Sequence, residues 1–350
     1  MRWDAMRLQD GGQAAPALFE RNAVARTFDT PGFRGMTFYE VHAKSVINRV
    51  PEASRMPFRW TINPYRGCSH ACVYCYARQT HTYLDLDAGH DFDSKIVVKV
   101  NAPERVRAEL AAPRWRGEHI AMGTNVDCYQ RAEGRYRLMP GILAALRDAA
   151  NPFSILTKGT LILRDIELLA EAAEVTDVGL AVSVGCADED LWRLLEPGTP
   201  SPRRRLDVCA RLTARGLGCA VLMGPVVPFL SDSPGQLAAT VRQAAAAGAA
   251  TVSPIVLHLR PGAREWFLRW LGEQHPDLLP RYRALYGRGS YTPKAYQQQV
   301  TEQVRALARQ YRIGQRPGGR GRPPRARFAG APAGPGAHPG SAAPVQLTLL

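Results

Sequence analysis

The 350-residue sequence predicts an α/β fold in which strands alternate with helices and form a parallel sheet or a barrel. Short β-branched or apolar runs alternate with segments of helical pattern, and each run is bounded by turn residues or by a helix start. No internal repeat of fixed period is present. Because 45% of the residues are hydrophobic, the chain is also rich enough in apolar side chains to build a large core.

Six runs are expected to form the strands. Their length and their β-branched composition are typical of buried strands, and their residue ranges are 58–62, 119–122, 153–156, 178–184, 218–223 and 251–257.

Four helices can be placed from their starts or their patterns. Ser201 and Ser233 are expected to cap two of them, because each serine is followed by a proline that suits the first helical position. Two further helices, over residues 263–271 and 293–311, are expected to cover an end of the sheet.

The two ends of the chain differ from its centre. Residues 1–35 are weakly patterned, since GGQAAPA and DTPGFRG interrupt any element, and we expect a weakly ordered N-terminal extension. The folded domain is expected over residues 36–315. Residues 316–343 are rich in Pro, Gly and Arg, and we expect a disordered linker because such a segment buries too little apolar surface to order itself. Residues 344–350 form a separate apolar peptide.

Composition narrows the classes of protein that the chain can belong to. No stretch approaches the ~20 uninterrupted apolar residues of a membrane span, and the N-terminus lacks the apolar region of a secretory signal. We therefore expect a cytoplasmic protein without a membrane partner. Its seven cysteines are expected to be reduced and available for metal binding or chemistry. The formal net charge of +14 favours polyanionic partners or anionic cofactors.

Three of the cysteines are closely spaced. Cys68, Cys72 and Cys75 stand as C-x3-C-x2-C in NPYRGCSHACVYCYAR, directly after the first expected strand. A [4Fe-4S] cube needs four ligands, so three cysteines leave one iron open to an exogenous ligand. S-adenosylmethionine (SAM) can chelate that iron, and an electron from the cluster can then cleave its sulfonium bond to give a 5'-deoxyadenosyl radical. The alternative is a zinc site completed by His70 or His81.

This spacing, with an aromatic residue just before the last cysteine, resembles the radical SAM superfamily. The blocks GTNVDCYQRAE, ILTKGTLILRDIELL, AVSVGCADEDLWRLLEPGTPSPRRRL and VVPFLSD extend the resemblance to the spore photoproduct lyase-like branch over residues 55–260. The resemblance implies a partial (β/α)6 barrel, with SAM lying across the carboxyl ends of the strands. It also implies that the cofactors are a [4Fe-4S] cluster and SAM, and that a reductant such as flavodoxin or ferredoxin is a partner.

The resemblance further implies roles for individual residues. Cys68, Cys72 and Cys75 would ligate the cluster. Tyr74 would pack beside the adenine and Tyr76 near the edge of SAM, whereas the alternative for both tyrosines is ordinary packing.

Five more residues would surround SAM. Lys158 would pair with its carboxylate, Ser183 would hydrogen-bond to it, and Asp127 would lie in the segment that holds its amino group. Glu196 and Arg205 would contact the ribose and carboxylate or pair with each other. The alternatives are a solvated strand-end lysine, a serine bonded to the backbone and a salt bridge at a helix end.

The segment around Asp127 departs from the family pattern. Relatives usually read T-D-x-Y-Q-P, whereas the chain has no proline here and carries Cys128. The cysteine that donates hydrogen in spore photoproduct lyases precedes this aspartate, where the chain has Thr124, Asn125 and Val126. Thymine-dimer repair is therefore not expected. Cys128 is a candidate hydrogen-atom donor, and the alternative is a packed thiol.

The substrate class is suggested only by charge and by the family branch. Both favour DNA or another nucleic acid, and the run Arg203, Arg204 and Arg205 adds a basic cluster, for which a solvated helix start is the alternative explanation. The rival hypothesis is a non-catalytic nucleic-acid-binding protein whose cysteines hold zinc or an inert iron-sulfur cluster.

The last residues suggest a second partner. Gln346, Leu347, Thr348, Leu349 and Leu350 resemble the Q-L-x-L-F peptide by which bacterial replication and repair proteins dock on the DNA sliding clamp, with Leu in place of the final Phe. The preceding Pro/Gly linker would provide reach. The alternative is that this peptide covers an edge of the barrel or frays.

Overall fold

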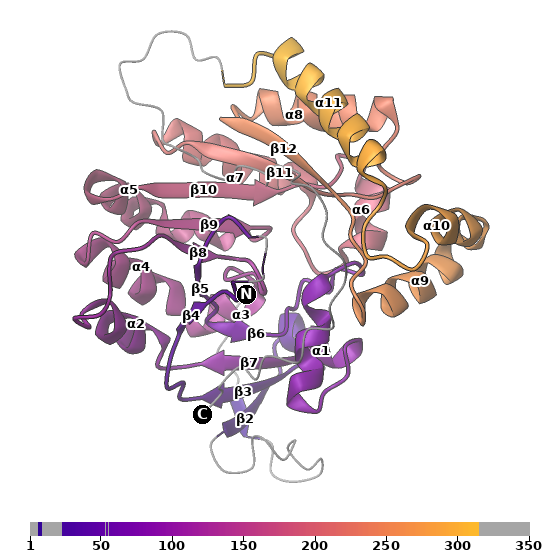
Figure 1. The fold of residues 1–350 in the computed structure, drawn as a ribbon. Coiled ribbons are helices and arrows are strands. Elements are labelled where there is room, and N and C mark those ends of the chain that lie inside the picture. Colours follow the sequence, from indigo (N-terminus) through magenta and orange to yellow (C-terminus); the bar gives the residue numbers. More distant parts are fainter. Residues whose placement is uncertain (1–5, 9–22, 53, 55, 315–350) are drawn as a thin grey trace.

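The computed structural model describes residues 6–8, 23–52, 54 and 56–314 (Figure 1). The linker at 316–343 and the peptide at 344–350 lie outside these residues. In the described part, a seven-stranded sheet has the order β12-β11-β10-β9-β8-β5-β4, and a five-stranded sheet has the order β1-β2-β3-β7-β6. The α/β class is confirmed.

The larger sheet contains all six expected strands in parallel, in their sequence order. These strands are β5 (Trp60–Ile62), β8 (Ile120–Met122), β9 (Phe153–Thr157), β10 (Val178–Ser183), β11 (Cys219–Val226) and β12 (Thr251–Val256). One further strand, β4 (Ile47–Arg49), pairs antiparallel with β5. Among the described residues β12 pairs with β11 alone, so the first and last parallel strands do not meet and the barrel is open between them. The expected partial barrel is confirmed.

Helices alternate with the strands along the chain, and most of them cover the outside of this sheet, whereas α6 lies at the ends of the strands (Figure 1). They are α2 (Ala102–Leu110), α3 (Arg131–Tyr136), α4 (Leu138–Asp148), η4 (Leu161–Asp165), α5 (Ile166–Val175), α6 (Glu189–Leu195), α7 (Pro202–Ala214) and α8 (Pro234–Ala246). The two expected caps are confirmed, because the Ser201 and Ser233 side chains accept hydrogen bonds from backbone N–H groups in the first turns of α7 and α8.

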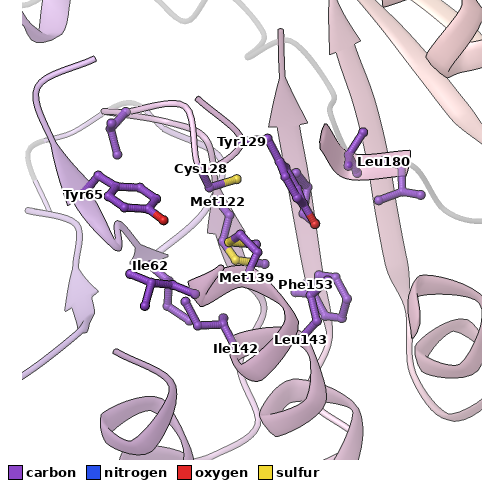
Figure 2. Packing of buried hydrophobic residues seen from close by; sticks show 14 of the residues in the cluster. Ile62, Tyr65, Met122, Cys128, Tyr129, Met139, Ile142, Leu143, Phe153 and Leu180 are labelled. Atoms are coloured by element: carbon purple, nitrogen blue, oxygen red, sulfur yellow. The ribbon is translucent and has the colours of Figure 1, made fainter. Parts of the chain in front are cut away.

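The main core lies between the strands and these helices (Figure 2). Ile62, Met122 and Phe153 from three neighbouring strands are fully buried there, and α4 contributes Ile142 and Leu143. Strands that are buried on both faces carry nearly continuous apolar runs, which explains why the sequence pattern located them.

The C-terminal helices divide between two positions. The last helix, α11 (Lys294–Gln310), packs on α8 and β12. The helices α9 (Ala263–Gln274), η5 (Pro276–Leu278) and α10 (Leu279–Tyr286) form a second core with the loop that carries the cysteines. Both helices that the sequence predicted in this part of the chain are therefore present.

The smaller sheet corrects the expectation that residues 1–35 are weakly ordered throughout. It comprises β1 (Met6–Leu8), β2 (Ala23–Phe28), β3 (Thr37–Val41), β6 (Tyr65–Arg66) and β7 (Lys95–Lys99), with the short helices η2 (Pro31–Phe33), η3 (Tyr76–Leu84) and α1 (His90–Ser94) nearby.

The order of this segment comes from its aromatic residues. Phe28, Phe33 and Phe38 are buried against one another, with ring centroids 5.0 to 5.6 Å apart. Their mutual burial outweighs the turn-forming composition of the segment.

Among the helices of the described residues, none combines the length and the apolar character that a bilayer crossing requires.

Candidate active site

The three cysteines lie on one loop, residues 67–75, at the carboxyl ends of the barrel strands. The loop is a succession of tight turns, because the carbonyls of Cys68, Cys72 and Cys75 each accept a hydrogen bond from the N–H three residues further on, at 3.1, 3.2 and 3.3 Å. All three thiols are free. The first two are buried and the third is half-buried.

The donor set suits an iron-sulfur cluster. Burial, together with the neighbouring Cys68 sulfur, raises the pKa of the Cys75 thiol to about 11. Burial and the Glu196 carboxylate likewise hold the pKa of Cys72 well above its usual range. Such thiols become thiolates readily only beside a positive centre, which bound metal supplies. Among the described residues, no three His, Cys, Asp or Glu side chains lie close enough together to hold one metal ion. An iron-sulfur cube does not need such a group, because it binds its thiolates at separate corners.

Gln130 anchors the loop from the barrel side. Its fully buried carboxamide accepts a hydrogen bond from the Ser69 N–H and donates one to the Gly67 carbonyl, both at 2.9 Å. These two backbone groups flank Cys68, so one side chain fixes the backbone on both sides of a candidate ligand. The sequence reasoning gave Gln130 no role, although it lies in the GTNVDCYQRAE block.

Arg78 anchors the loop from the opposite side. Its buried guanidinium donates to the Cys72 carbonyl at 3.0 and 3.1 Å and to the carbonyls of Ala88 and Gly89 at 3.1 and 2.9 Å. It also pairs with Asp93 at 2.8 Å. Sequence reasoning missed Arg78 as well, and its place three residues after the last cysteine was the available signal.

The end of α6 and the residues that follow it hold the middle of the loop. The N–H of Gly198 donates to the carbonyl of His70 at 3.1 Å, and the N–H of Val73 donates to the carbonyl of Leu195 at 3.0 Å. A β-carbon on Gly198 would lie 2.1 Å from the Ser69 carbonyl oxygen, so only glycine permits this approach.

Asp127 sits beneath the loop and joins it to the strand ends. Its carboxylate accepts from the Thr157 hydroxyl at 2.7 Å and from the Lys158 N–H at 2.6 Å, and it lies 3.3 Å from Nδ1 of His70. Burial would raise the pKa of Asp127, but the protonated His70 and these hydrogen bonds outweigh it and lower the pKa to about 2. Asp127 is therefore an anion that is already fully bonded within the protein.

Five of the predicted residues form one buried network. The Tyr74 hydroxyl donates to Glu196, and Arg205 pairs with the same carboxylate at 2.5 Å. Lys158 lies 3.8 Å from Glu196 and donates to the Ser183 hydroxyl at 2.8 Å. Burial would raise the pKa of Glu196, but Arg205 and Lys158 outweigh it and lower the pKa, so the carboxylate is ionised. The structure thus contains the ion pair that was one of the alternatives for Glu196 and Arg205.

The other two predicted residues lie apart from this network. The Tyr76 hydroxyl donates to the Thr124 carbonyl in the loop after β8. Cys128 is fully buried in the main core near Met122 and Met139, where burial holds the pKa of its thiol well above the usual range (Figure 2). This position favours the packed-thiol alternative for Cys128.

The family model of the radical SAM superfamily matches residues 62–240, which include the cysteine loop, Asp127 and the whole buried network. The chain belongs to the radical SAM superfamily. Members of this superfamily bind a [4Fe-4S] cluster and SAM, and the three free thiols agree with membership.

Two relatives of this chain differ in how much of it they match. An uncharacterized protein of Mycobacterium tuberculosis is 49% identical over 320 residues, which cover 89% of this chain and 93% of the relative. An uncharacterized protein of Methanocaldococcus jannaschii is 31% identical over 195 residues, covering 55% of this chain and 69% of the relative.

Among solved structures, the radical SAM fold of this chain is similar to spore photoproduct lyase complexed with dinucleoside spore photoproduct. The TM-score is 0.58 at 14% identity, with 79% of this chain and 80% of the lyase covered. A variant of the lyase with bound AdoMet is equally similar, with a TM-score of 0.58 at 14% identity, and covers 79% of each chain. At this identity the likeness extends to the fold alone.

Proposed function

We propose that this protein is a radical SAM enzyme that reductively cleaves SAM to a 5'-deoxyadenosyl radical, with Cys68, Cys72 and Cys75 holding a [4Fe-4S] cluster. The observation that carries the proposal is a loop of three free thiols fixed by Gln130 and Arg78 beside a buried network of charges. When bound, the cluster supplies the electron that breaks the sulfonium bond, and a reductant such as flavodoxin or ferredoxin replaces that electron.

The surrounding side chains would bind and orient SAM. Lys158, with Ser183, offers a charge-assisted hydrogen bond to the SAM carboxylate. Tyr74 would pack beside the adenine, and its hydroxyl is already held by Glu196. Asp127 would act chiefly by holding the Lys158 backbone in place, because both of its carboxylate oxygens are engaged within the protein.

We propose a nucleic acid as the substrate class. The support is the net charge of +14 and a fold similar to a lyase whose bound ligand is a dinucleoside spore photoproduct. Lys and Arg contacts to phosphate release counterions, so binding of DNA should weaken steeply as salt rises. A shallow salt dependence would favour a small-molecule or protein substrate.

The test of the proposed function is anaerobic reconstitution with iron and sulfide. The wild type should gain the absorption of an iron-sulfur cluster and, with dithionite, should form 5'-deoxyadenosine from SAM. The variants Cys68→Ala, Cys72→Ala and Cys75→Ala should lose both properties, whereas Cys186→Ala and Cys209→Ala should keep them. Loss of a single motif cysteine without loss of the cluster would disprove the ligand assignment.

The same measurement separates the enzyme from its rival. A non-catalytic nucleic-acid-binding protein would bind zinc, or an inert cluster, and would form no 5'-deoxyadenosine under reducing conditions. Stoichiometric zinc in the purified protein, together with no SAM cleavage after reconstitution, would establish this alternative.

Lys158→Ala tests the SAM site directly. Loss of one charge-assisted hydrogen bond is worth about 1.5 to 3 kcal/mol, so the dissociation constant for SAM should rise roughly ten-fold or more. Lys294→Ala is the matched control, because Lys294 is exposed at the start of α11. Equal affinities in the two variants would remove Lys158 from the site.

We also propose that the C-terminal peptide docks on the DNA sliding clamp through Gln346, Leu347, Leu349 and Leu350, which lie outside the described residues. A synthetic peptide of residues 340–350 titrated against purified clamp should bind in the micromolar range and lose binding on Gln346→Ala. No binding at several hundred micromolar would mean a binding free energy weaker than ~5 kcal/mol and would exclude the clamp as a partner.

A further inference from the structure

A row of three aromatic side chains runs outward from the cysteine loop. Tyr76, which follows Cys75, contacts His258 with ring centroids 5.7 Å apart and planes inclined by 38°. His258 in turn contacts Tyr291 at 5.6 Å and 31°. Tyr291 ends the row with 55% of its surface exposed, which is unusual for so large a side chain.

The row crosses the open side of the barrel. His258 follows β12, the last parallel strand, and Tyr76 begins η3, directly after the cysteine loop that follows β5, the first one. These two strands do not pair, so the contact between Tyr76 and His258 bridges the gap at the rim. The outer end of the row is held by the backbone, where the Leu259 N–H donates to the Ser290 carbonyl at 2.7 Å.

The chemistry of the row suits a planar ring attached to an anion. The Arg260 guanidinium lies 5.3 Å from the Tyr76 ring centroid, is exposed, and forms no ion pair within the described part of the chain. Burial and the Arg260 charge lower the pKa of His258 to about 4, so its ring is neutral at physiological pH. The row thus presents flat, uncharged faces beside one cation, a combination that accepts a base and its phosphate.

We propose that Tyr76, His258, Tyr291 and Arg260 form a stacking site for an unpaired nucleobase, in which the base lies on Tyr291 and Arg260 faces its phosphate. This inference rests on the proposed nucleic-acid substrate and assigns residues to its recognition. The row leads from the surface to Cys75, so a nucleotide held on it is directed toward the cluster loop. Because every base has an aromatic face, the site would bind unpaired strands with little preference for sequence.

The test uses the reconstituted protein and a short single-stranded oligonucleotide carrying 2-aminopurine. Binding is followed by fluorescence anisotropy, and stacking by quenching of the 2-aminopurine. Stacking of one base on an aromatic side chain predicts that Tyr291→Ala weakens binding roughly 5- to 150-fold and removes the quenching. Tyr291→Phe should retain both, because the ring remains.

Two further variants provide a control for the tyrosine and a test of the phosphate contact. Tyr83→Ala is the matched control, since Tyr83 is another exposed tyrosine of the cysteine-loop region, on η3, and should bind the oligonucleotide as the wild type does. Arg260→Gln should lower the slope of log affinity against log salt by about one, as expected for one lost phosphate contact.

Failure of this inference can be told from failure of the proposed function. Formation of 5'-deoxyadenosine by the wild type without oligonucleotide measures SAM cleavage alone. If the wild type cleaves SAM but Tyr291→Ala binds and quenches as the wild type does, the stacking site is wrong and the enzyme stands. Binding of the oligonucleotide without any quenching, or no binding by the wild type, would also overturn the stacking site.

Discussion

Gln130 should be essential for building the cluster site although it ligates nothing. The variant Gln130→Ala removes a fully buried carboxamide and leaves the Ser69 N–H and the Gly67 carbonyl without partners on either side of Cys68. Each unsatisfied buried group costs about 1 to 3 kcal/mol, so the loop in its present conformation should lose about 2 to 6 kcal/mol. This is a large fraction of the stability of a typical domain.

The expected result is a protein that keeps the three motif cysteines but takes up little iron. Iron and sulfide per protein after anaerobic reconstitution should fall clearly below the wild-type values. The free energy of unfolding of the apoprotein should fall by at most about 6 kcal/mol, the upper end of this estimate. The conservative variant Gln130→Glu keeps the acceptor for Ser69 but turns a second oxygen toward the Gly67 carbonyl. It should load iron no better than Gln130→Ala.

Gln297→Ala is the matched control, because Gln297 is a half-buried glutamine on α11 that donates to the Thr292 carbonyl at 2.7 Å. That variant should cost about 1 kcal/mol of stability and load iron fully. If Gln130→Ala and Gln297→Ala have the same iron content, the cysteine loop does not depend on the Gln130 carboxamide and the reasoning fails.

Three other predictions concern stability and are checked by urea denaturation. Burial lowers the pKa of Lys99 to about 8, below its unfolded value of about 10.4, so its charge destabilises the fold below pH 8. Lys99→Met should therefore stabilise the protein by on the order of 3 kcal/mol at pH 7, and this gain should vanish as the pH rises to about 10; a gain independent of pH would contradict it. Glu133→Ala should lower the free energy of unfolding by about 3 to 5 kcal/mol, because the buried carboxylate accepts hydrogen bonds from Tyr65, Arg164 and the start of α4. A loss below about 1 kcal/mol would show that these groups find other partners. Ser201→Ala should cost about 1 kcal/mol through loss of the α7 cap, and should leave iron content unchanged.

The larger sheet was predictable because its signal is local. Each of its six parallel strands, such as Val178–Ser183, was recognised from a short run of residues without knowledge of its partner, whereas the antiparallel β4 was not predicted. The smaller sheet carries this signal only in part. Residues 96–98 of β7 are a β-branched run that the sequence prediction did not assign to a strand. Its β6, in contrast, is two residues long, and β3 pairs in parallel with β7 across more than fifty residues of chain, so the sheet depends on partners that are distant in the sequence.

The same distinction divides the residues of the site. The motif spacing pointed to the cysteines, and the family resemblance pointed to Tyr74, Lys158 and Glu196, whose side chains are neighbours in the structure. Gln130 and Arg78 were not identified because their partners at the cysteine loop are backbone carbonyls and N–H groups. Every residue carries such groups, so only the folded chain shows which of them a given side chain reaches.

If SAM binds at the proposed site, the buried network explains why Lys158, and not Arg205, would meet its carboxylate. Arg205 lies 2.5 Å from one oxygen of Glu196 and donates to the Ser183 carbonyl at 2.7 Å. The Glu196 carboxylate therefore balances the charge of Arg205, and the two contacts fix its position. Lys158 lies 3.8 Å from the other oxygen and is bonded to a neutral hydroxyl. Because a carboxylate attracts a cation more strongly than a hydroxyl does, a ligand carboxylate can displace Ser183 from Lys158 without breaking the ion pair. Arg205 thus acts as a positioning residue that compensates Glu196 and leaves Lys158 available.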